Sequence, residues 1–343
     1  ERPRTVATTS GGIMSLPTAR LGTTDMEITR VGFGAWAIGG GSWVFGWGSQ
    51  DDKDSIDAIR HAVDHGINWI DTAAVYGLGH SEEVVGQAIK DVPGRPYIFT
   101  KCGMLWDSAW NVKRIARPDT IPRELEASLQ RLGVERIDLY QVHWPPEDGT
   151  PVEEYWQTMV QLRQEGRVRA VGLSNHGVPL LEKAEKIGHV DSLQPPLSMI
   201  NRTQADAIAW CARNGTGVIV YSPMHSGLLT GSFSRERVES LPQDDWRRHS
   251  PDFTTNLDRN LALAEALRPI ASRHGVTQAG VAVAWTLAWP GVTGAIVGAR
   301  NPGQLDGWLP AASLRLTQDD LDEIAAAIER TGAGEGPVRP LSV

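Results

Sequence analysis

The stretch Asn-Trp-Ile-Asp-Thr-Ala-Ala-Val-Tyr-Gly at residues 68–77 begins with a short apolar run and then presents a carboxylate, Asp71, and a phenol, Tyr76. Two later runs of similar composition end in the same manner, the first at Lys101 and the second at His143. Short apolar runs rich in β-branched and aromatic residues predict buried strands. If these strands lie parallel, the four polar side chains meet at one edge of the sheet, where the strands end.

Strand-like runs of this kind alternate with amphipathic helical patterns on both sides of residues 68–77. The strands are expected at 28–38, 68–73, 97–101, 137–143, 168–174, 192–195, 217–222 and 294–297. The helices are expected at 54–65, 81–90, 121–132, 152–164, 179–186, 204–214, 257–273, 278–287, from 302 onward, and at 317–330. The chain therefore contains eight successive units of a strand followed by a helix.

Alternating strands and helices imply a parallel sheet with right-handed crossovers, and eight such units close most readily into a barrel. We therefore predict the α/β class and a (β/α)8 TIM barrel with long βα loops over its C-terminal face. The active site of such a barrel lies at the carboxyl ends of its strands. Two connections on that side are unusually long, residues 102–117 and the charged residues 231–255. We expect both to cover substrate or cofactor, with the tail after residue 331 as a candidate third loop.

Composition places the chain among globular proteins and argues against several other classes. It has 343 residues, 41% of them hydrophobic and 22% charged, which is enough for one large core. We expect a single domain at 16–343. Residues 1–15 are expected to be either a disordered tail or residues added ahead of a natural start at Met14. The net charge of −8 argues against binding to nucleic acids or to anionic membranes.

Cysteine usage and hydropathy predict the compartment. Cys102 and Cys211 are too few and too far apart for a disulfide framework or a zinc site, which favours a reducing cytoplasm. No apolar run approaches the ~20 residues of a membrane-spanning helix, and the first residues lack the core of a signal peptide. We therefore expect a cytoplasmic protein with no metal.

The four polar residues suit the protonation of an oxygen that becomes negative. A phenol has an unperturbed pKa of ~10, and a neighbouring ammonium such as Lys101 lowers that pKa toward working pH. Asp71, as an ion-pair partner, keeps Lys101 protonated. Tyr76 can then act as general acid, while His143 donates a hydrogen bond that orients a carbonyl oxygen. Because no side chain carries hydride, reduction of a carbonyl requires a nicotinamide cofactor.

From residue 21 to residue 325 the sequence resembles the aldo-keto reductase superfamily. Within it, the sequence is most similar in character to the bacterial general-stress aldo-keto reductases, a branch related to the potassium-channel β-subunits. The matching segments are Gly32-Phe33-Gly34-Ala35-Trp36, Asp71-Thr72-Ala73 with Tyr76-Gly77, Ser81-Glu82, Thr100-Lys101, Asp138-Leu139-Tyr140-Gln141-Val142-His143-Trp144-Pro145, Gly172-Leu173-Ser174-Asn175, Gln194, Tyr221-Ser222-Pro223, Gly227-Leu228-Leu229-Thr230-Gly231 and Gly298-Ala299-Arg300-Asn301-Pro302-Gly303-Gln304-Leu305. So many matches in order make the resemblance specific.

The resemblance implies a catalytic set and a cofactor site. The catalytic set comprises Asp71, Tyr76, Lys101 and His143. Ser174, Asn175 and Gln194 are expected to hold the nicotinamide carboxamide, with Tyr221 stacked on the ring. The pyrophosphate path is expected along Ser222, Pro223, Gly227 and Leu228. The remaining cofactor contacts are expected from Gly34, Trp36, Asp71, Gly298, Ala299, Arg300 and Gln304.

Arg300 matches the family position that meets the 2′-phosphate of NADPH, and a guanidinium suits that dianion, so NADP(H) is the expected cofactor. Trp308 stands where many relatives have an asparagine that contacts adenine, which implies either weaker adenine recognition or stacking. The partner is expected to be a small-molecule carbonyl substrate. The residues placed for its pocket are Trp36, Tyr76, Trp106, Trp110 and His143.

Other interpretations have weaker support. Gly32 and Gly34 follow a strand as in a dinucleotide fingerprint, but no helix opens after them. His61 and His65 lie four residues apart, as in the helix of a zinc protease, yet Asp64 is not at the position of the catalytic base between them. Ser174 lacks the following glycine that a nucleophile elbow requires.

Two functional alternatives remain open. One is a reductase or dehydrogenase of sugars or keto-sugars, and the other is a slow-turnover binding protein that senses its cofactor.

Overall fold

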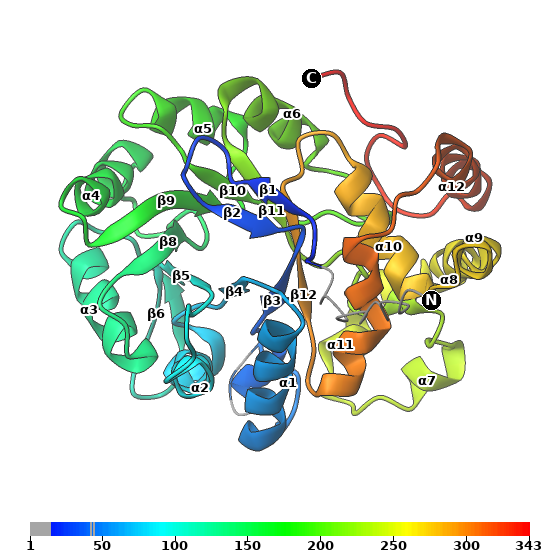
Figure 1. Ribbon diagram of the computed structural model, residues 1–343, viewed down its shortest axis with the longest axis horizontal. Helices are drawn as coiled ribbons and strands as arrows, with labels where there is room; N and C mark the ends of the chain where they lie inside the picture. The colour runs from blue at the N-terminus through cyan, green and yellow to red at the C-terminus, as the bar shows by residue number, and fades with distance from the viewer. Residues whose placement is uncertain (1–14, 42, 44) are drawn as a thin grey trace, which may run out of the picture.

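The computed structural model describes residues 15–343 except 42 and 44, and its central feature is a closed parallel barrel (Figure 1). The strands of this barrel, in the order in which they pair, are β3 (Val31–Gly34), β4 (Trp69–Asp71), β5 (Tyr97–Cys102), β8 (Ile137–Val142), β9 (Val168–Ser174), β10 (Ser192–Gln194), β11 (Gly217–Val220) and β12 (Gly294–Gly298). The last strand, β12, pairs in parallel with β3 and closes the ring. The (β/α)8 TIM barrel expected from the alternating pattern is confirmed.

Helices surround the strands as an outer ring in Figure 1. They are α1 (Asp52–Asp64), α2 (His80–Ile89), α3 (Thr120–Leu132), α4 (Val152–Gln164), α5 (Val178–Glu185), α6 (Ala205–Asn214), α7 (Arg235–Glu239), α8 (Leu257–Ala266), α9 (Arg268–His274), α10 (Gln278–Ala288), α11 (Pro302–Trp308) and α12 (Gln318–Thr331). The prediction of one helix at 257–273 was wrong, because α8 ends before Leu267 and α9 begins at Arg268. Pro269, in the first turn of α9, has no N–H to continue α8.

Side chains at the helix starts fix several of these boundaries. The Asp51 carboxylate accepts hydrogen bonds from two backbone N–H groups of the first turn of α1. Thr317 and Asp320 form a reciprocal capping box at the start of α12. Each cap satisfies donors that have no partner inside the helix.

The amino end of the barrel is closed by a small hairpin that the sequence pattern did not predict. Its strands are β1 (Thr18–Arg20) and β2 (Glu27–Thr29), so the single strand expected at 28–38 is in fact two short strands, β2 and β3. Leu21 and Met26 of this hairpin pack against Trp69 and Phe99 inside the barrel. Gly32 is required here, since a Cβ at this position would overlap the Trp69 indole ring.

The long βα loops are built differently from one another. The long connection at residues 102–117, for which no secondary structure was predicted, contains an antiparallel hairpin, β6 (Met104–Trp106) and β7 (Val112–Arg114). The loop between β11 and α8 carries α7 and three 3-10 turns. The predicted tail at 1–15 lies, apart from Ser15, outside the described residues.

The chain after α12 is attached to the loop that follows β10. Arg202 N donates to Glu335 O (2.8 Å), Glu335 N donates to Ile200 O (3.0 Å), and the Arg202 guanidinium donates to the Pro337 carbonyl oxygen (3.1 Å). The C-terminal segment therefore lies on the side of the barrel where the strands end. In the described part of the chain, no helix is both long enough and apolar enough to cross a membrane.

Candidate active site

The four residues singled out from the sequence lie together at the carboxyl ends of β4, β5 and β8. Lys101 Nζ donates to Asp71 Oδ1 (2.5 Å), to the Thr72 carbonyl oxygen (2.8 Å) and to the Tyr76 hydroxyl oxygen (3.3 Å). An ammonium has three donors, so these bonds use all of them and fix its position. The phenolic oxygen accepts from Lys101, which leaves the O–H of Tyr76 available for another molecule.

A tight turn brings Tyr76 back over the end of β4. Gly77 and Leu78 have φ of 61° and 53°, in the left-handed region. A Cβ on residue 77 would collide with the carbonyl group of Gly39 from the loop after β3, so glycine is required there. The sequence Tyr76-Gly77 is therefore one structural unit that places the phenol beside Lys101.

Burial and charge act in opposite directions on the two partners of this hydrogen bond. Burial lowers the pKa of Lys101, but Asp71 and then Tyr76 raise it, and the balance is a raised pKa. Burial raises the pKa of Tyr76, and this outweighs the lowering by Lys101. The expectation that Lys101 brings the phenol pKa below its ordinary value is therefore wrong for the net shift. The expectation is right for the contribution of Lys101 alone, which lowers the pKa of Tyr76. The net raised pKa of Tyr76 keeps the phenol protonated.

His143 completes the group from the end of β8. Its ring approaches the Tyr76 ring edge-on, with 5.7 Å between the centroids. Burial, followed by the positive charges of Lys101 and Arg114, lowers the pKa of His143 well below its usual value. The imidazole is therefore neutral near pH 7, and it can donate one hydrogen bond but is not a source of protons.

Gln194 and Gln141 bind the second oxygen of Asp71. Gln194 Nε2 donates to Asp71 Oδ2 (2.9 Å) and to Gln141 Oε1 (2.8 Å), and Gln141 Nε2 donates to Asp71 Oδ2 (3.1 Å). We expected Gln194 at this site, whereas the sequence interpretation missed Gln141. The signal was a polar residue inside the buried strand at 137–142.

Asn175 joins three of the other expected site residues. Its Nδ2 donates to the His143 carbonyl oxygen (3.1 Å) and to Ser174 Oγ (3.3 Å), and its Oδ1 accepts from the Tyr221 hydroxyl (2.5 Å). Asn175 has φ of 59°, a conformation that costs free energy in a residue other than glycine. Backbone strain of this kind concentrates at functional sites.

Two buried side chains behind Asn175 hold its neighbour in place. The Ser174 carbonyl oxygen can only accept, so His176 Nδ1 donates to it (2.7 Å), and His176 Nε2 then accepts from the Tyr155 hydroxyl (2.8 Å). Burial lowers the pKa of His176 to about 4, so the ring stays neutral at physiological pH. Sequence reasoning missed both Tyr155 and His176.

The turn after β11 is the most strained segment of this rim. Ser222, His225 and Ser226 all have φ between 50° and 54°, and Gly227 has φ of 93°. His225 anchors the turn, with Nε2 2.7 Å from Asp252 Oδ2 and Nδ1 3.1 Å from Ser198 Oγ. The hydrogen bond from His225 is also the main reason that the pKa of Asp252 is lowered. Pro223 and Leu228 belong to the same turn, so the expected pyrophosphate residues are adjacent in space.

The Aldo/keto reductase family model matches residues 30–329. That match covers the barrel strands, the four residues Asp71, Tyr76, Lys101 and His143, and the strained turn described above. The chain belongs to the aldo/keto reductase family. It is thus an oxidoreductase of that family.

Several proteins are similar to this aldo/keto reductase along most of its length. The aldo-keto reductase YhdN of Bacillus subtilis is 36% identical over 313 residues, which cover 90% of this chain and 92% of the relative. The NADH-specific methylglyoxal reductase of Escherichia coli is 34% identical over 328 residues, covering 90% and 98%. The structure of the glycerol dehydrogenase AKR11B4 from Gluconobacter oxydans superimposes with a TM-score of 0.84 at 35% identity, covering 95% of this chain and 98% of that chain.

In this aldo/keto reductase, Arg300 lies just after β12 and is connected to the loop before α1. Arg300 Nε donates to Gln50 Oε1 (2.9 Å), and Nη2 donates to the Ser49 carbonyl oxygen (2.7 Å). Both partners are neutral, so neither cancels the positive charge of the guanidinium. Gln304 accepts from Arg300 N through Oε1 (2.8 Å), which ties the start of α11 to the same point.

Gly298 and Ala299, the other expected cofactor residues at the end of β12, lie beside β3. Gly298 pairs with Gly34 across the two strands, and Ala299 is buried directly after Gly298. Trp308 donates through its indole N–H to the Gly298 carbonyl oxygen (3.1 Å) and is only 2% exposed. A ring packed this deeply cannot stack on a base, so the stacking interpretation of Trp308 is wrong.

Aromatic side chains surround Tyr76 on the open side. Trp36 stacks on Tyr76 with 6.5 Å between the ring centroids, and Trp43 lies 6.2 Å from the same ring. Trp106 packs against this cluster. Trp110 does not belong to it and is 58% exposed in the turn between β6 and β7. The sequence interpretation missed Trp43 and also Trp47, which meets Trp36 edge-on at 5.2 Å.

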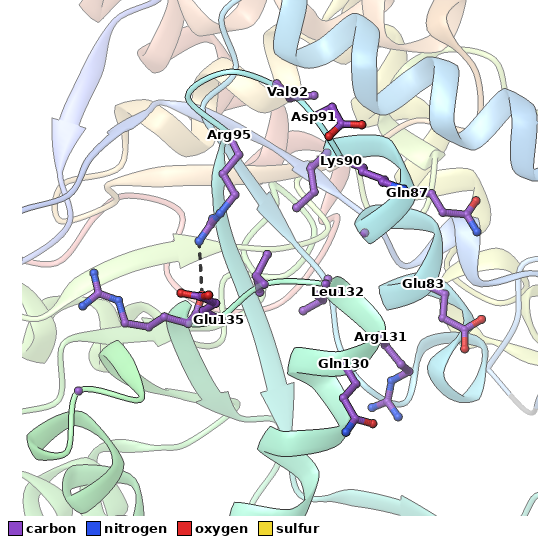
Figure 2. Close-up of a pocket in the computed structure, with 16 residues that line it drawn as sticks. Glu83, Gln87, Lys90, Asp91, Val92, Arg95, Gln130, Arg131, Leu132 and Glu135 are labelled. Carbon is purple, nitrogen blue, oxygen red and sulfur yellow. Dashed lines mark hydrogen bonds between the residues drawn. The ribbon is translucent and has the colours of Figure 1, made fainter.

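A groove of about 1330 Å³ lies elsewhere on the molecule, between the C-terminal ends of α2 and α3 (Figure 2). Its lining includes Lys90, Arg95 and Glu135, which precede β5 and β8, so it lies toward the amino ends of the strands. In Figure 2, Arg95 extends from one loop toward the other, where it donates to the Arg136 carbonyl oxygen. None of the expected site residues lines this groove.

The histidine pair singled out from the sequence does not form a metal site in the described residues. His61 Nε2 binds Asp306 Oδ1 at 2.7 Å, and His65 Nδ1 binds the His61 carbonyl oxygen at 2.7 Å. Across residues 15–343, leaving aside 42 and 44, no three side chains of the metal-ligating types are grouped closely enough to hold an ion.

Proposed function

We propose that this protein is an NADPH-dependent reductase that converts aldehydes and ketones to alcohols, with Tyr76 as the general acid. The observation that carries the proposal is the ammonium of Lys101, whose three donors are committed to Asp71, Thr72 and the phenolic oxygen. This arrangement leaves the Tyr76 O–H as the proton donor that faces an incoming carbonyl. Bound NADPH supplies the hydride for the carbonyl carbon.

The chain's own residues handle the proton and the orientation of the substrate. Tyr76 transfers its proton to the carbonyl oxygen as negative charge develops there, and the Lys101 ammonium stabilises the resulting phenolate. The neutral His143 donates a hydrogen bond to the same oxygen and so fixes its direction. A positioned proton donor contributes roughly 10²–10⁴-fold to the rate.

The strained turn and the polar rim fit a dinucleotide. Successive backbone N–H groups in left-handed turns form concave anion sites, and the turn at 222–227 has this character. It suits a pyrophosphate, and Ser174, Asn175 and Gln194 offer polar atoms beside His143 for the carboxamide. The Tyr221 hydroxyl donates to Asn175, and this contact supports the proposal that the Tyr221 ring stacks on the nicotinamide.

Preference for NADPH over NADH rests on Arg300. A guanidinium has five N–H donors, and two of its nitrogens are used here on neutral oxygens, so charge and further donors remain for a 2′-phosphate. The relative in Escherichia coli is named as NADH-specific, so the preference needs a direct test. We expect Arg300→Gln to weaken NADPH binding about tenfold or more and to leave NADH binding within about twofold.

A second candidate function is the oxidation or reduction of polyols, sugars or keto-sugars. Two observations favour it. Trp36, Trp47 and Trp246 form an edge-to-face series at the mouth, whose flat faces can pack against sugar C–H surfaces. The similar structure from Gluconobacter oxydans is a glycerol dehydrogenase.

One panel of assays tests both candidates. NADPH oxidation is measured across aldehydes, ketones and keto-sugars, with NADH in parallel and with polyols in the oxidative direction. The main proposal predicts turnover of simple carbonyls with NADPH preferred. Turnover confined to sugars and polyols would select the second candidate. Tight cofactor binding with negligible repeated turnover of every substrate would instead favour a cofactor-sensing protein.

A further inference from the structure

Gln141 is fully buried inside the barrel and connects two parts of the site that are far apart in sequence. It lies on β8, between Asp71 on β4 and Gln194 on β10. Its Nε2 donates to Asp71 Oδ2 (3.1 Å) and to the Thr100 carbonyl oxygen (3.4 Å), and its Oε1 accepts from Gln194 Nε2 (2.8 Å). Both ends of its amide are therefore in use.

The donors and acceptors fix the orientation of Gln194. Carboxylate oxygens of ionised Asp71 can only accept, and Gln141 presents its carbonyl oxygen because its own NH₂ faces Asp71 and Thr100. Gln194 must therefore direct both N–H bonds inward, to Asp71 Oδ2 and Gln141 Oε1. Its Oε1 receives no hydrogen bond from any described residue. Gln194 thus offers the cofactor pocket an acceptor and no donor.

We propose that Gln141 is a positioning residue that holds Gln194 with its carbonyl oxygen toward the NH₂ of the cofactor's carboxamide, through their shared contact with Asp71. The inference rests on the proposed nicotinamide site and adds a residue to it. Without Gln141, one of the two inward acceptors for Gln194 is lost, and the amide is free to turn. Asp71 also loses a donor, so the proton-donating group and the cofactor are coupled through one side chain.

The test compares two cofactors that differ only in the group that Gln194 should recognise. NADPH carries a carboxamide, whereas its 3-acetylpyridine analogue has a methyl ketone with no N–H. Dissociation constants are measured by quenching of tryptophan fluorescence. The variant is Gln141→Met, which keeps the length of the side chain and removes its polar atoms. The matched control is Leu139→Met, an apolar change two residues away on the same strand.

We expect wild-type protein and Leu139→Met to bind NADPH about five- to tenfold more tightly than the analogue, as for one hydrogen bond. In Gln141→Met this ratio should fall to within about twofold. An unchanged ratio in folded Gln141→Met would overturn the inference. Failure of wild-type protein to bind either NADPH or NADH would instead refute the proposed function, so the two failures are distinguishable.

A second variant keeps the inference testable if Gln141→Met does not fold. The side chain of Gln141→Glu, when protonated, can donate its O–H to Asp71 and still accept from Gln194, so it mimics glutamine. When ionised it can still accept a hydrogen bond, but it loses its donor to Asp71 and the two carboxylates repel each other, which separates the two acceptors of Gln194. The charged groups that face this side chain include the carboxylate of Asp71 on β4 and the ammonium of Lys101 on β5. We expect the binding ratio in this variant to be near wild type at low pH and to collapse as pH rises. A ratio that does not change with pH would contradict the inference.

Discussion

The two faces of β5 carry buried charge in two different ways. On the inner face, Lys101 pairs with Asp71 and leaves the Tyr76 O–H open to the mouth of the barrel. On the outer face, Glu82 accepts from Thr100 (2.8 Å), Ser128 (3.1 Å) and Arg131 (2.8 Å). Both arrangements bury a carboxylate, but only the inner one places an uncommitted O–H at the mouth of the barrel. A buried ion pair therefore indicates function only when a group beside it remains uncommitted.

Replacing the inner cation should have the largest effect on activity. Lys101→Met removes the donor to Tyr76 and leaves Asp71 buried without its cation. We expect the reductive kcat to fall by about 10²–10⁴-fold, because the phenolate is no longer stabilised. Steady-state kinetics with saturating cofactor measure this. Circular dichroism and thermal unfolding serve as controls, and a folded variant with near-native kcat would contradict the role.

Neutralising the outer carboxylate should affect stability and spare catalysis. Glu82→Gln keeps the shape of the side chain but loses the charge that binds Arg131. Hydrogen bonds to charged groups contribute about 1.5–3 kcal/mol each, so we expect the free energy of unfolding to fall by about that amount. Urea unfolding measures the loss, and kcat per folded molecule should stay within about twofold. A large drop in kcat without loss of stability would contradict the claim that the outer carboxylate serves stability and the inner one serves catalysis.

Glu124, also on the outer side of β5, should make stability depend on pH. Its carboxylate accepts from Gly103 N at 3.2 Å, and burial raises its pKa from 4.5 to about 8. The folded state therefore holds this proton more tightly than the unfolded chain does. The contribution is full below about pH 4.5, falls as pH rises, and is gone above about pH 8. We expect wild-type protein to lose several kcal/mol over this range from Glu124 alone, on the order of 1.4 kcal/mol per pKa unit.

Glu124→Gln removes this titration and provides the comparison. Thermal unfolding at pH 6 and at pH 9 should show a smaller loss of stability in the variant than in wild-type protein. Equal losses in the two proteins would mean that Glu124 does not titrate in this range. Activity at pH 7 should change little, since Glu124 lies on the side of β5 away from Tyr76.

The smallest effect is expected from Trp110, which the sequence suggested for the substrate pocket. Its side chain is 58% exposed and outside the cluster around Tyr76. Trp110→Ala should change KM by less than about twofold, whereas Trp36→Ala should raise KM clearly, because Trp36 stacks on Tyr76. A strong KM effect from Trp110→Ala would mean that the β6–β7 hairpin closes over bound substrate.

The barrel was predictable because its signal is local and repeated. A short apolar run predicts a buried strand, and apolar residues at helical spacing predict a helix. Both patterns involve only a few neighbouring residues. Helix α4 and strand β9 begin and end at the expected residues. The hairpin at β1–β2 and the break at Leu267 were missed, since short strands and a proline in a first helical turn leave little periodic signal.

The site was predictable only in part, because hydrogen-bond partners come from strands far apart. Asp71 is 70 residues from Gln141 and 123 from Gln194, so no sequence spacing relates them. Tyr155 and His176 were missed because only the packing of α4 against the end of β9 brings their side chains together. The net pKa of Tyr76 also depends on how deeply the turn buries it, which a sequence does not state.

The central claim is that the Tyr76 O–H, freed by the donor from Lys101, delivers the proton. The most direct test is the single-turnover rate of hydride transfer in Tyr76→Phe with NADPH already bound. We predict a rate at least about 100-fold below wild type, with the NADPH dissociation constant within about twofold. Hydride transfer at the wild-type rate in this variant would contradict the account.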